Sequence, residues 1–136
     1  MTATYRLQLH AGFTFADAEQ TVPYLADLGV THLYLSPVLE AVAGSMHGYD
    51  VVDHGRVSEA LGGQAGLERL AGTARTHGLG IVVDVVPNHM ALVAPLHANT
   101  ALWDVLRRGR ASAYAPWFDV DWDALDGRIG LPLLGE

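Results

Sequence analysis

The segment DVVPNH, residues 84–89, places three side chains capable of directed polar contacts close together. The β-branched run around Asp84 is typical of a buried strand, which we predict over residues 81–86. Pro87 cannot donate to a sheet ladder, so it ends the strand and leaves Asn88 and His89 at the carboxyl end. An unpartnered carboxylate in such a run costs on the order of several kcal/mol, so we expect a cation or a hydrogen-bond donor to face Asp84.

The elements before this segment alternate between strands and helices. Strands are predicted over residues 5–9 and 32–35, and a helix between them ends at Gly29. Thr14 and Asp17 resemble a capping box at its start, and Pro23 predicts a kink or two shorter helices. The apolar positions of this helix recur at helical spacing: Phe15, Ala18, Val22, Leu25 and Leu28.

A long loop containing several glycines is predicted from Val38 to about Gly63. A second helix follows it and ends at Gly78, with its apolar positions at Leu67, Leu70, Ala71 and Ala74. The glycine-rich turn over residues 62–66 lacks the Lys and Ser/Thr of a phosphate loop, so we interpret it as a helix start. The resulting order β-α-β-α-β predicts a parallel sheet with right-handed crossovers.

Polar residues gather directly after each predicted strand. They are Gln8 and His10, the stretch 47–53, and Asn88 with His89. A barrel collects its active site at this end of its strands, whereas a nucleotide-binding sheet needs a glycine-rich turn after its first strand. The corresponding turn here, HAGFTF, has one glycine. The arrangement therefore favours a barrel.

Composition excludes several classes of function. The 136 residues carry a net charge of -7, and their eight basic residues are all arginines without a basic stripe, which argues against nucleic acid as a partner. Without cysteine there are no disulfides or thiolate metal sites. The seven histidines form no HExxH pattern, so we expect no metal and no cofactor. The absence of a signal segment or a membrane span predicts a soluble, cytoplasmic protein without a membrane partner.

Four segments together resemble the alpha-amylase superfamily of glycoside hydrolases: YRLQL (5–9), LGVTHLYLSPVL (28–39), GSMHGYDVVDH (44–54) and DVVPNHMA (84–91). Two later segments, WDVLRRGRASAYAPWFDVDW (103–122) and LPLLG (131–135), are similar to its trehalose-forming subfamily, the maltooligosyl trehalose synthases. The resemblance implies an α/β fold that is the N-terminal part of a (β/α)8 TIM barrel. Residues 1–92 would form about three of its eight β/α units, and residues 93–136 would begin a subdomain inserted after the third strand.

The resemblance also implies roles for individual residues at a sugar subsite. Asp84 would pair with an arginine on a later strand, and His89 would bind glucose hydroxyl groups. Tyr49 would stack under the sugar ring, and His47 and Asp50 would line the same subsite. An aromatic face and charged partners suit the apolar face and hydroxyl rim of glucose.

Other polar and aromatic residues receive simpler interpretations. Asn88 matches a calcium-ligating position of many amylases, but here we expect it to brace the loop. Asp53 and His54 are also expected to brace their loop. Core or lid packing is the favoured role of the aromatic residues near the C-terminus, with sugar stacking as the alternative: Trp103, Tyr114, Trp117, Phe118 and Trp122.

The implied activity is that of an isomerase, a (1->4)-alpha-D-glucan 1-alpha-D-glucosylmutase. It would convert the reducing-end bond of a maltooligosaccharide to an α,α-1,1 bond by intramolecular transglycosylation. Its nucleophile Asp and its acid Glu would lie on later strands, so we expect no catalytic residue in this chain and no activity from it alone. Two alternatives stay open, namely part of an α-glucan hydrolase of the same superfamily and a non-catalytic glucan-binding piece.

Overall fold

The structure is a computed structural model that describes residues 2–92 and 95–131. The chain divides into two compact units, Met1–Val93 and Ala94–Glu136. That the second unit is a subdomain inserted into a barrel stays a prediction, and the segment 132–135 of the resemblance lies outside the described residues.

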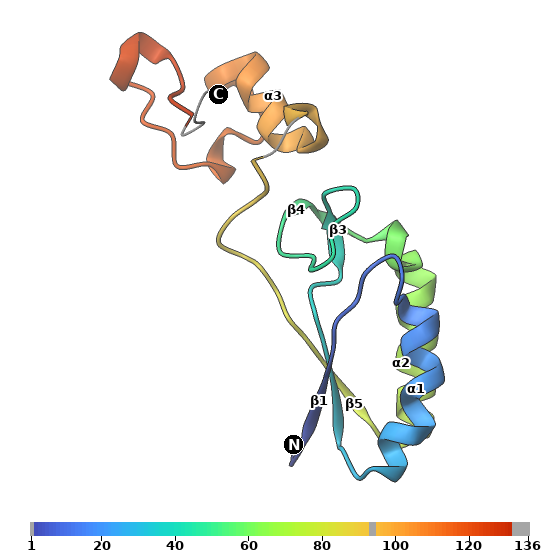
Figure 1. Ribbon diagram of the computed structural model, residues 1–136. Coiled ribbons are helices and arrows are strands. Elements are labelled where there is room, and N and C mark those ends of the chain that lie inside the picture. The colour runs from blue at the N-terminus through green and yellow to red at the C-terminus, as the bar shows by residue number, and fades with distance from the viewer. Residues whose placement is uncertain (1, 93–94, 132–136) are drawn as a thin grey trace. The chain divides into compact units, whose positions relative to one another are not determined.

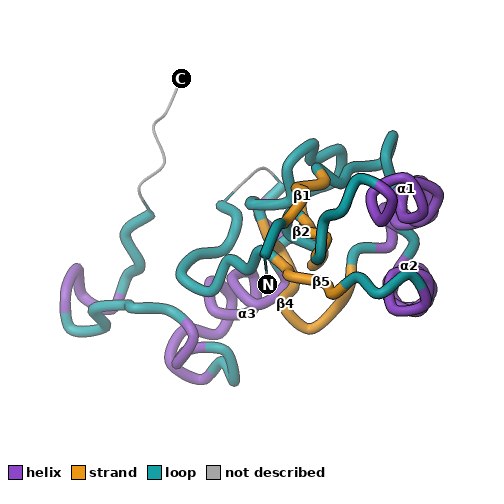
Figure 2. Tube along the Cα trace, turned by 90° about the horizontal axis from the view of Figure 1, so that it is seen from below, coloured by secondary structure: helices purple, strands orange, loops and turns teal. Residues whose placement is uncertain are grey.

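The first unit contains a parallel sheet of three strands in the order β1 (Thr4–Leu7), β2 (His32–Leu35) and β5 (Gly80–Val83). Helices α1 (Phe15–Asp27) and α2 (Gly63–Thr76) connect the strands. Both views show the two helices on the same side of the sheet (Figures 1 and 2). The parallel β-α-β-α-β arrangement predicted from the sequence is confirmed.

The core lies between this sheet and the two helices. Leu7, Leu33 and Leu35 contribute the apolar side chains of β1 and β2, and all three are buried. The helices contribute the buried residues Phe15, Ala18, Val22, Leu25, Leu70 and Ala74. The burial of these helical positions follows from their spacing, which places them on one face of each helix.

Helix α1 begins with the predicted capping interaction. The Asp17 carboxylate accepts hydrogen bonds from the backbone N–H and the hydroxyl of Thr14, at 2.8 and 2.7 Å. The helix continues through Pro23 as one element, so the alternative of two shorter helices is wrong. Leu28 does not belong to the buried face, because the helix ends at Asp27 and the Leu28 side chain is 55% exposed.

Helix α2 begins where the glycine-rich turn predicted a helix start. Gly62 precedes it in the left-handed region, with φ of 110°. Gly66 packs closely on α1, because a Cβ at this position would lie 3.1 Å from Phe15 Cδ2. Leu67 packs against the core as expected, but Ala71 is exposed. Gly78, with φ of 75°, follows the end of the helix.

Two strands are shorter than predicted. Strand β1 ends at Leu7, since the Leu9 N–H donates to the Ser36 hydroxyl at 2.8 Å and not to a neighbouring strand. Strand β5 ends at Val83, although the Asp84 N–H still donates to the Leu35 carbonyl at 2.9 Å. The valines of this region are therefore not buried on both faces throughout, and Val85 is 63% exposed.

The segment between Val38 and Gly63 is not one long loop as predicted. It contains an antiparallel hairpin of β3 (Leu39–Ala41) and β4 (Val51–Val57), followed by a short 3-10 helix, η1 (Glu59–Leu61). The register between β3 and β4 shifts on both sides of Glu40. These irregularities, with polar residues along β4, obscure the alternation by which a strand is recognised.

Within residues 95–131, the second unit has one α-helix, α3 (Thr100–Arg108). Asn99 caps it by accepting the Leu102 N–H at 3.0 Å, and Leu102 and Val105 are buried. Short 3-10 helices make up the remaining regular structure: η2 (Leu96–Ala98), η3 (Gly109–Ala111), η4 (Ala115–Trp117) and η5 (Ala124–Gly127). Across residues 2–92 and 95–131, no helix is long and apolar enough to cross a membrane.

The aromatic residues of this unit divide between packing and exposure. Trp103 is 40% and Trp117 is 60% exposed, whereas Phe118 and Trp122 are half-buried. Tyr114 and Trp117 pack edge to face with their ring centroids 5.0 Å apart, and the Arg110 guanidinium lies 5.9 Å from the Trp122 ring. Core packing therefore accounts for only part of the group.

Candidate sugar subsite

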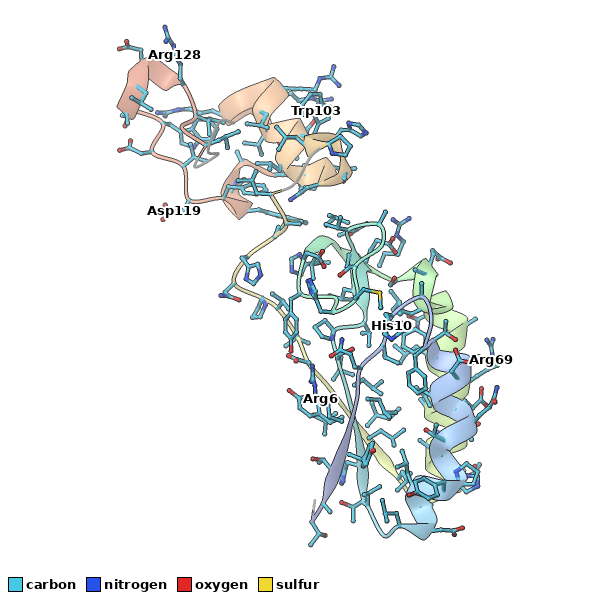
Figure 3. All side chains as sticks on the ribbon, in the orientation of Figure 1. Arg6, His10, Arg69, Trp103, Asp119 and Arg128 are labelled. Atoms are coloured by element: carbon cyan, nitrogen blue, oxygen red, sulfur yellow. The ribbon has the colours of Figure 1, made fainter. Side chains whose placement is uncertain are left out.

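The candidate site lies at the carboxyl end of the parallel sheet. The hairpin β3–β4 lies beyond this end of β1 and β2, and the chain leaving β5 runs past it (Figure 1). Register pairs Arg6 with Tyr34 and Tyr34 with Val82, so these residues share the sheet face opposite the leucines of the core. Arg6 lies on the side of the sheet away from the helices (Figure 3).

Asp84 has the charged and hydrogen-bonding partners that its position required. Its Oδ2 atom accepts a hydrogen bond from the Tyr49 hydroxyl at 2.5 Å and faces Arg6 Nη1 at 3.4 Å. The Asp84 side chain is only 17% exposed, so the two donors replace much of its solvation. The expected cation or donor is therefore present, and it comes from β1 and the β3–β4 hairpin.

Arg6 extends this contact into a network. Its Nη2 atom donates to the Tyr49 hydroxyl at 3.1 Å and to Gln8 Oε1 at 3.3 Å. Its guanidinium group lies 4.9 Å from the centre of the Tyr34 ring, within cation–π distance. Arg6 thus contacts a carboxylate, a phenol, an amide and an aromatic face at once.

These contacts shift two ionisation equilibria. The hydrogen bond to Asp84, assisted by desolvation, raises the pKa of Tyr49, while Arg6 opposes the shift. Desolvation acts to lower the pKa of Arg6, but its contacts with Tyr49 and Asp84 outweigh this effect and raise the pKa overall. Tyr49 therefore stays protonated, and its hydroxyl donates a hydrogen bond to Asp84, while Arg6 remains a cation.

Tyr49 is carried by a tight turn between the two strands of the hairpin. Gly48, before it, has φ of 76°, and a Cβ at this position would lie 2.8 Å from the Pro37 carbonyl oxygen. Its N–H donates to the Ser45 hydroxyl at 3.1 Å. Only glycine combines this left-handed backbone with such a close approach, so Gly48 fixes the path of the chain into Tyr49.

His47 and Asp50 lie on either side of Tyr49 in the chain. The His47 and Tyr49 rings stack with centroids 6.0 Å apart, and the Tyr49 N–H donates to His47 Nδ1 at 3.1 Å. Asp50 accepts a hydrogen bond from the Ser45 hydroxyl. The same His47 Nδ1 lies 3.7 Å from Asp50 Oδ1, but a nitrogen that accepts the Tyr49 N–H cannot also donate to the carboxylate.

His89 and Asn88 approach the same turn from the end of β5. His89 Nε2 donates to the Tyr49 carbonyl at 3.2 Å, and its other nitrogen lies 3.3 Å from Asn88 Oδ1. Both side chains are exposed. Two residues outside this group brace the structure: Asp53 accepts the Gly55 N–H at 2.8 Å, and His54 Nε2 donates to the Val86 carbonyl at 2.8 Å.

The structure brings the predicted site residues together around the Gly48–Tyr49 segment, where Asp50 is joined through the Ser45 hydroxyl: His47, Tyr49, Asp50, Asp84, Asn88 and His89. Arg6 was not predicted as a site residue, and Gln8 was predicted only as part of a polar cluster. Both alternate with the buried Leu7 and Leu9, and this period of two could have identified them as residues of the opposite sheet face. In the described part of the chain, no three His, Asp or Glu residues form a metal-binding group.

A model of the alpha-amylase catalytic domain matches residues 17–121. The chain belongs to the alpha-amylase family. Within this family it is 56% identical, over 98% of its length, to a Mycobacterium tuberculosis (strain H37Rv) protein provisionally assigned as a maltooligosyl trehalose synthase. A cyclomaltodextrinase of Geobacillus thermopakistaniensis is 34% identical over 71% of the chain and 15% of its own length.

Solved structures give the same relationship within the alpha-amylase family. The maltooligosyltrehalose synthase of Arthrobacter ramosus matches the whole chain with a TM-score of 0.93 and 54% identity. The chain spans 18% of that protein and 18% of the M. tuberculosis relative. The fold is therefore the first part of an alpha-amylase-type TIM barrel, and the residues of the network lie on it.

Proposed function

We propose that this chain supplies part of the glucose subsite of a maltooligosyl trehalose synthase. The observation that carries the proposal is the single network that joins Asp84, Tyr49 and His89 at the carboxyl end of the sheet. It combines an aromatic ring with a carboxylate and an imidazole, which suits the apolar face and the hydroxyl rim of a glucose ring. The close similarity to the A. ramosus enzyme over the whole chain supports the choice of subfamily.

In this proposal Tyr49 stacks on the glucose ring, and His89 and Asp84 bind its hydroxyl groups. His47 and Asp50 line the subsite, and Asn88 braces His89. Asp84 would be shared with an arginine on a later strand. Each charge-assisted contact with a hydroxyl contributes about 1.5–3 kcal/mol.

The reaction proposed for the full-length protein is an intramolecular transglycosylation, which classes it as an isomerase. A carboxylate nucleophile displaces the reducing-end glucose of a maltooligosaccharide while a carboxylic acid donates a proton to the leaving oxygen. The freed glucose then attacks the glycosyl-enzyme through its anomeric hydroxyl, gives its proton back to the carboxylate base, and forms the α,α-1,1 bond. The substrate is an α-1,4-glucan, and no cofactor is consumed.

The residues of this chain are proposed to bind and not to perform the bond cleavage. Asp84 is engaged by Arg6 and Tyr49, and Asp50 is engaged by Ser45. Neither is presented as a free carboxyl beside a second one, which a retaining mechanism requires at a separation of about 5–5.5 Å. We therefore expect residues 1–136 alone to be inactive.

The experiment is to incubate the full-length protein with maltopentaose and to measure reducing ends over time. Loss of reducing ends with formation of a product stable to alkaline reagents marks the isomerase. Gain of reducing ends marks a hydrolase, which the 34% identity to a cyclomaltodextrinase makes the natural competitor. Residues 1–136 assayed in parallel should change neither quantity, and turnover by them would refute the division of roles.

The second unit is proposed to begin a subdomain that limits access of water to the freed glucose. Aromatic side chains and an amphipathic helix, α3, are present in residues 95–131. Deletion of these residues from the full-length protein should raise the ratio of hydrolysis to transfer. The ratio is obtained from glucose release and from loss of reducing ends in the same reaction, and an unchanged ratio would contradict this role.

A further inference from the structure

We infer that Arg6 and Gln8, here called the β1 clamp, are positioning residues for the sugar subsite. The inference rests on the proposed function and adds to it two residues to which the resemblance assigned no role and which lie outside the matched region 17–121. Both residues belong to the stretch formed by β1 and the residues directly after it, and both point to the sheet face of Tyr34 and Asp84.

The Tyr49 hydroxyl is held by two partners. It donates to Asp84 at 2.5 Å and accepts from Arg6 Nη2 at 3.1 Å, so one oxygen is held by two opposed hydrogen bonds. A Tyr hydroxyl with a donor and an acceptor partner has a fixed direction, and the ring direction is fixed with it. The hydroxyl end of the ring that would face a glucose is therefore held jointly by Arg6 of β1 and by Asp84.

Gln8 holds the backbone of the turn that carries Tyr49. Gln8 Nε2 lies 3.3 Å from the Met46 carbonyl and 3.4 Å from the His47 carbonyl, and donates to both. Its Oε1 atom accepts from Arg6 at 3.3 Å. Gln8 thus joins the backbone before Gly48 to the same guanidinium that holds the Tyr49 side chain. The β1 clamp therefore binds the main chain of the turn through Gln8 and the Tyr49 side chain through Arg6.

The planar guanidinium of Arg6 contacts several partners at once. Arg6 reaches Asp84, Tyr49 and Gln8 through its two terminal nitrogens while its guanidinium lies over the Tyr34 ring at 4.9 Å. A planar fork can satisfy these partners together, whereas the ammonium of lysine is a point charge that lacks the fork geometry. The site therefore requires arginine and not merely a positive charge.

The test uses the full-length protein and measures kcat and KM for maltopentaose. Arg6→Met should lower kcat/KM about 10- to 100-fold, and Arg6→Lys should recover only part of the loss. Arg69→Met is the matched control, since Arg69 lies on α2 on the far side of the sheet (Figure 3) and makes no side-chain hydrogen bond or ion pair within residues 2–92 and 95–131. It should stay within about twofold of wild type.

A double-substitution cycle separates positioning from a general effect on folding. In the background of Tyr49→Phe, which lacks the shared hydroxyl, Arg6→Met should have a clearly smaller effect on kcat/KM than in wild type. If Arg6→Met lowers kcat/KM by the same factor in the wild-type and Tyr49→Phe backgrounds, the inference is overturned. Wild-type kinetics for Arg6→Met would also overturn it. If Arg6→Met does not fold, Arg6→Lys and Gln8→Ala are measured in its place. Wild-type kinetics in both variants would overturn the inference.

Failure of the proposed function gives a different result. A wild-type protein that does not consume reducing ends would refute the trehalose-forming reaction irrespective of any variant. Calorimetric titration of maltopentaose then still tests the β1 clamp, because Arg6→Met should weaken binding and Arg69→Met should not. Equal affinity in both variants would overturn the inference.

Discussion

The two faces of the parallel sheet in the first unit differ in how they are held together. The face toward α1 and α2 is closed by leucines such as Leu33 and Leu35, which are completely buried and need no directed contact. The opposite face carries Arg6, Tyr34 and Asp84, which are joined by hydrogen bonds and a cation–π contact and stay partly exposed. The helix-facing side stabilises the fold by apolar packing, whereas the opposite face orients polar side chains by directed contacts. Substitutions on the two faces should therefore affect different measurements.

The largest effect on stability is expected from the helix-facing side. Leu33→Ala removes a completely buried side chain between the sheet and the helices, and should cost about 2–5 kcal/mol of unfolding free energy. The denaturant midpoint of the full-length protein measures this loss. Val85→Ala is the control, because Val85 is 63% exposed and its loss should change stability by less than about 0.5 kcal/mol. A similar denaturant midpoint for Leu33→Ala and Val85→Ala would contradict the assignment of stability to the helix-facing side.

On the opposite face, Asp84→Asn should reduce activity much more than stability. It retains the size of the side chain but removes the charge that faces Arg6. Loss of a charge-assisted contact of about 1.5–3 kcal/mol corresponds to about a 10- to 150-fold decrease in kcat/KM for maltopentaose. The denaturant midpoint should stay close to that of wild type. A variant that unfolds like Leu33→Ala but retains normal kinetics would contradict the assignment of this face to function.

His89→Ala sharpens the comparison at the edge of the network. The side chain is exposed and contacts the Tyr49 carbonyl, so its removal leaves the core untouched. We expect a loss of about 2 kcal/mol of transition-state stabilisation, measured as kcat/KM. His77→Ala, on an exposed histidine at the end of α2, is the control. Wild-type activity in His89→Ala would remove this residue from the subsite.

The smallest effect is a pH dependence on the helix-facing side. Hydrogen bonds from the Thr14 backbone and hydroxyl lower the pKa of Asp17. The folded-state pKa lies below the unfolded value of about 3.9, so the stabilisation is present above that pH and is lost as the pH falls through the folded-state pKa. The difference in denaturant midpoint between wild type and Asp17→Asn should therefore shrink toward acid pH. A difference that is constant with pH would assign the stabilisation to another cause.

The sequence predicted the helix-facing side well because local patterns determine it. The spacing of Phe15, Ala18, Val22 and Leu25 requires one buried helical face, and β2 has the predicted bounds. The DVVPNH motif and the polar stretch 47–53 likewise contain the residues that the structure brings together at the carboxyl end of the sheet. Local patterns could not show the partner of Asp84, since Arg6 lies 78 residues earlier and meets it only through the pairing of β1, β2 and β5. They also missed the β3–β4 hairpin, whose register shifts interrupt alternation.

The close approach of Gly48 to the Pro37 carbonyl has a consequence for the sequences that this fold can accept. In a library randomised over residues 46–50 and selected for growth on the product, position 48 should return to glycine in nearly every survivor. Met46, whose side chain is 58% exposed, should accept many replacements, because the backbone carbonyl that Gln8 binds is common to all amino acids. The tolerance of each position in this turn would then follow from whether its main chain or its side chain makes the contact.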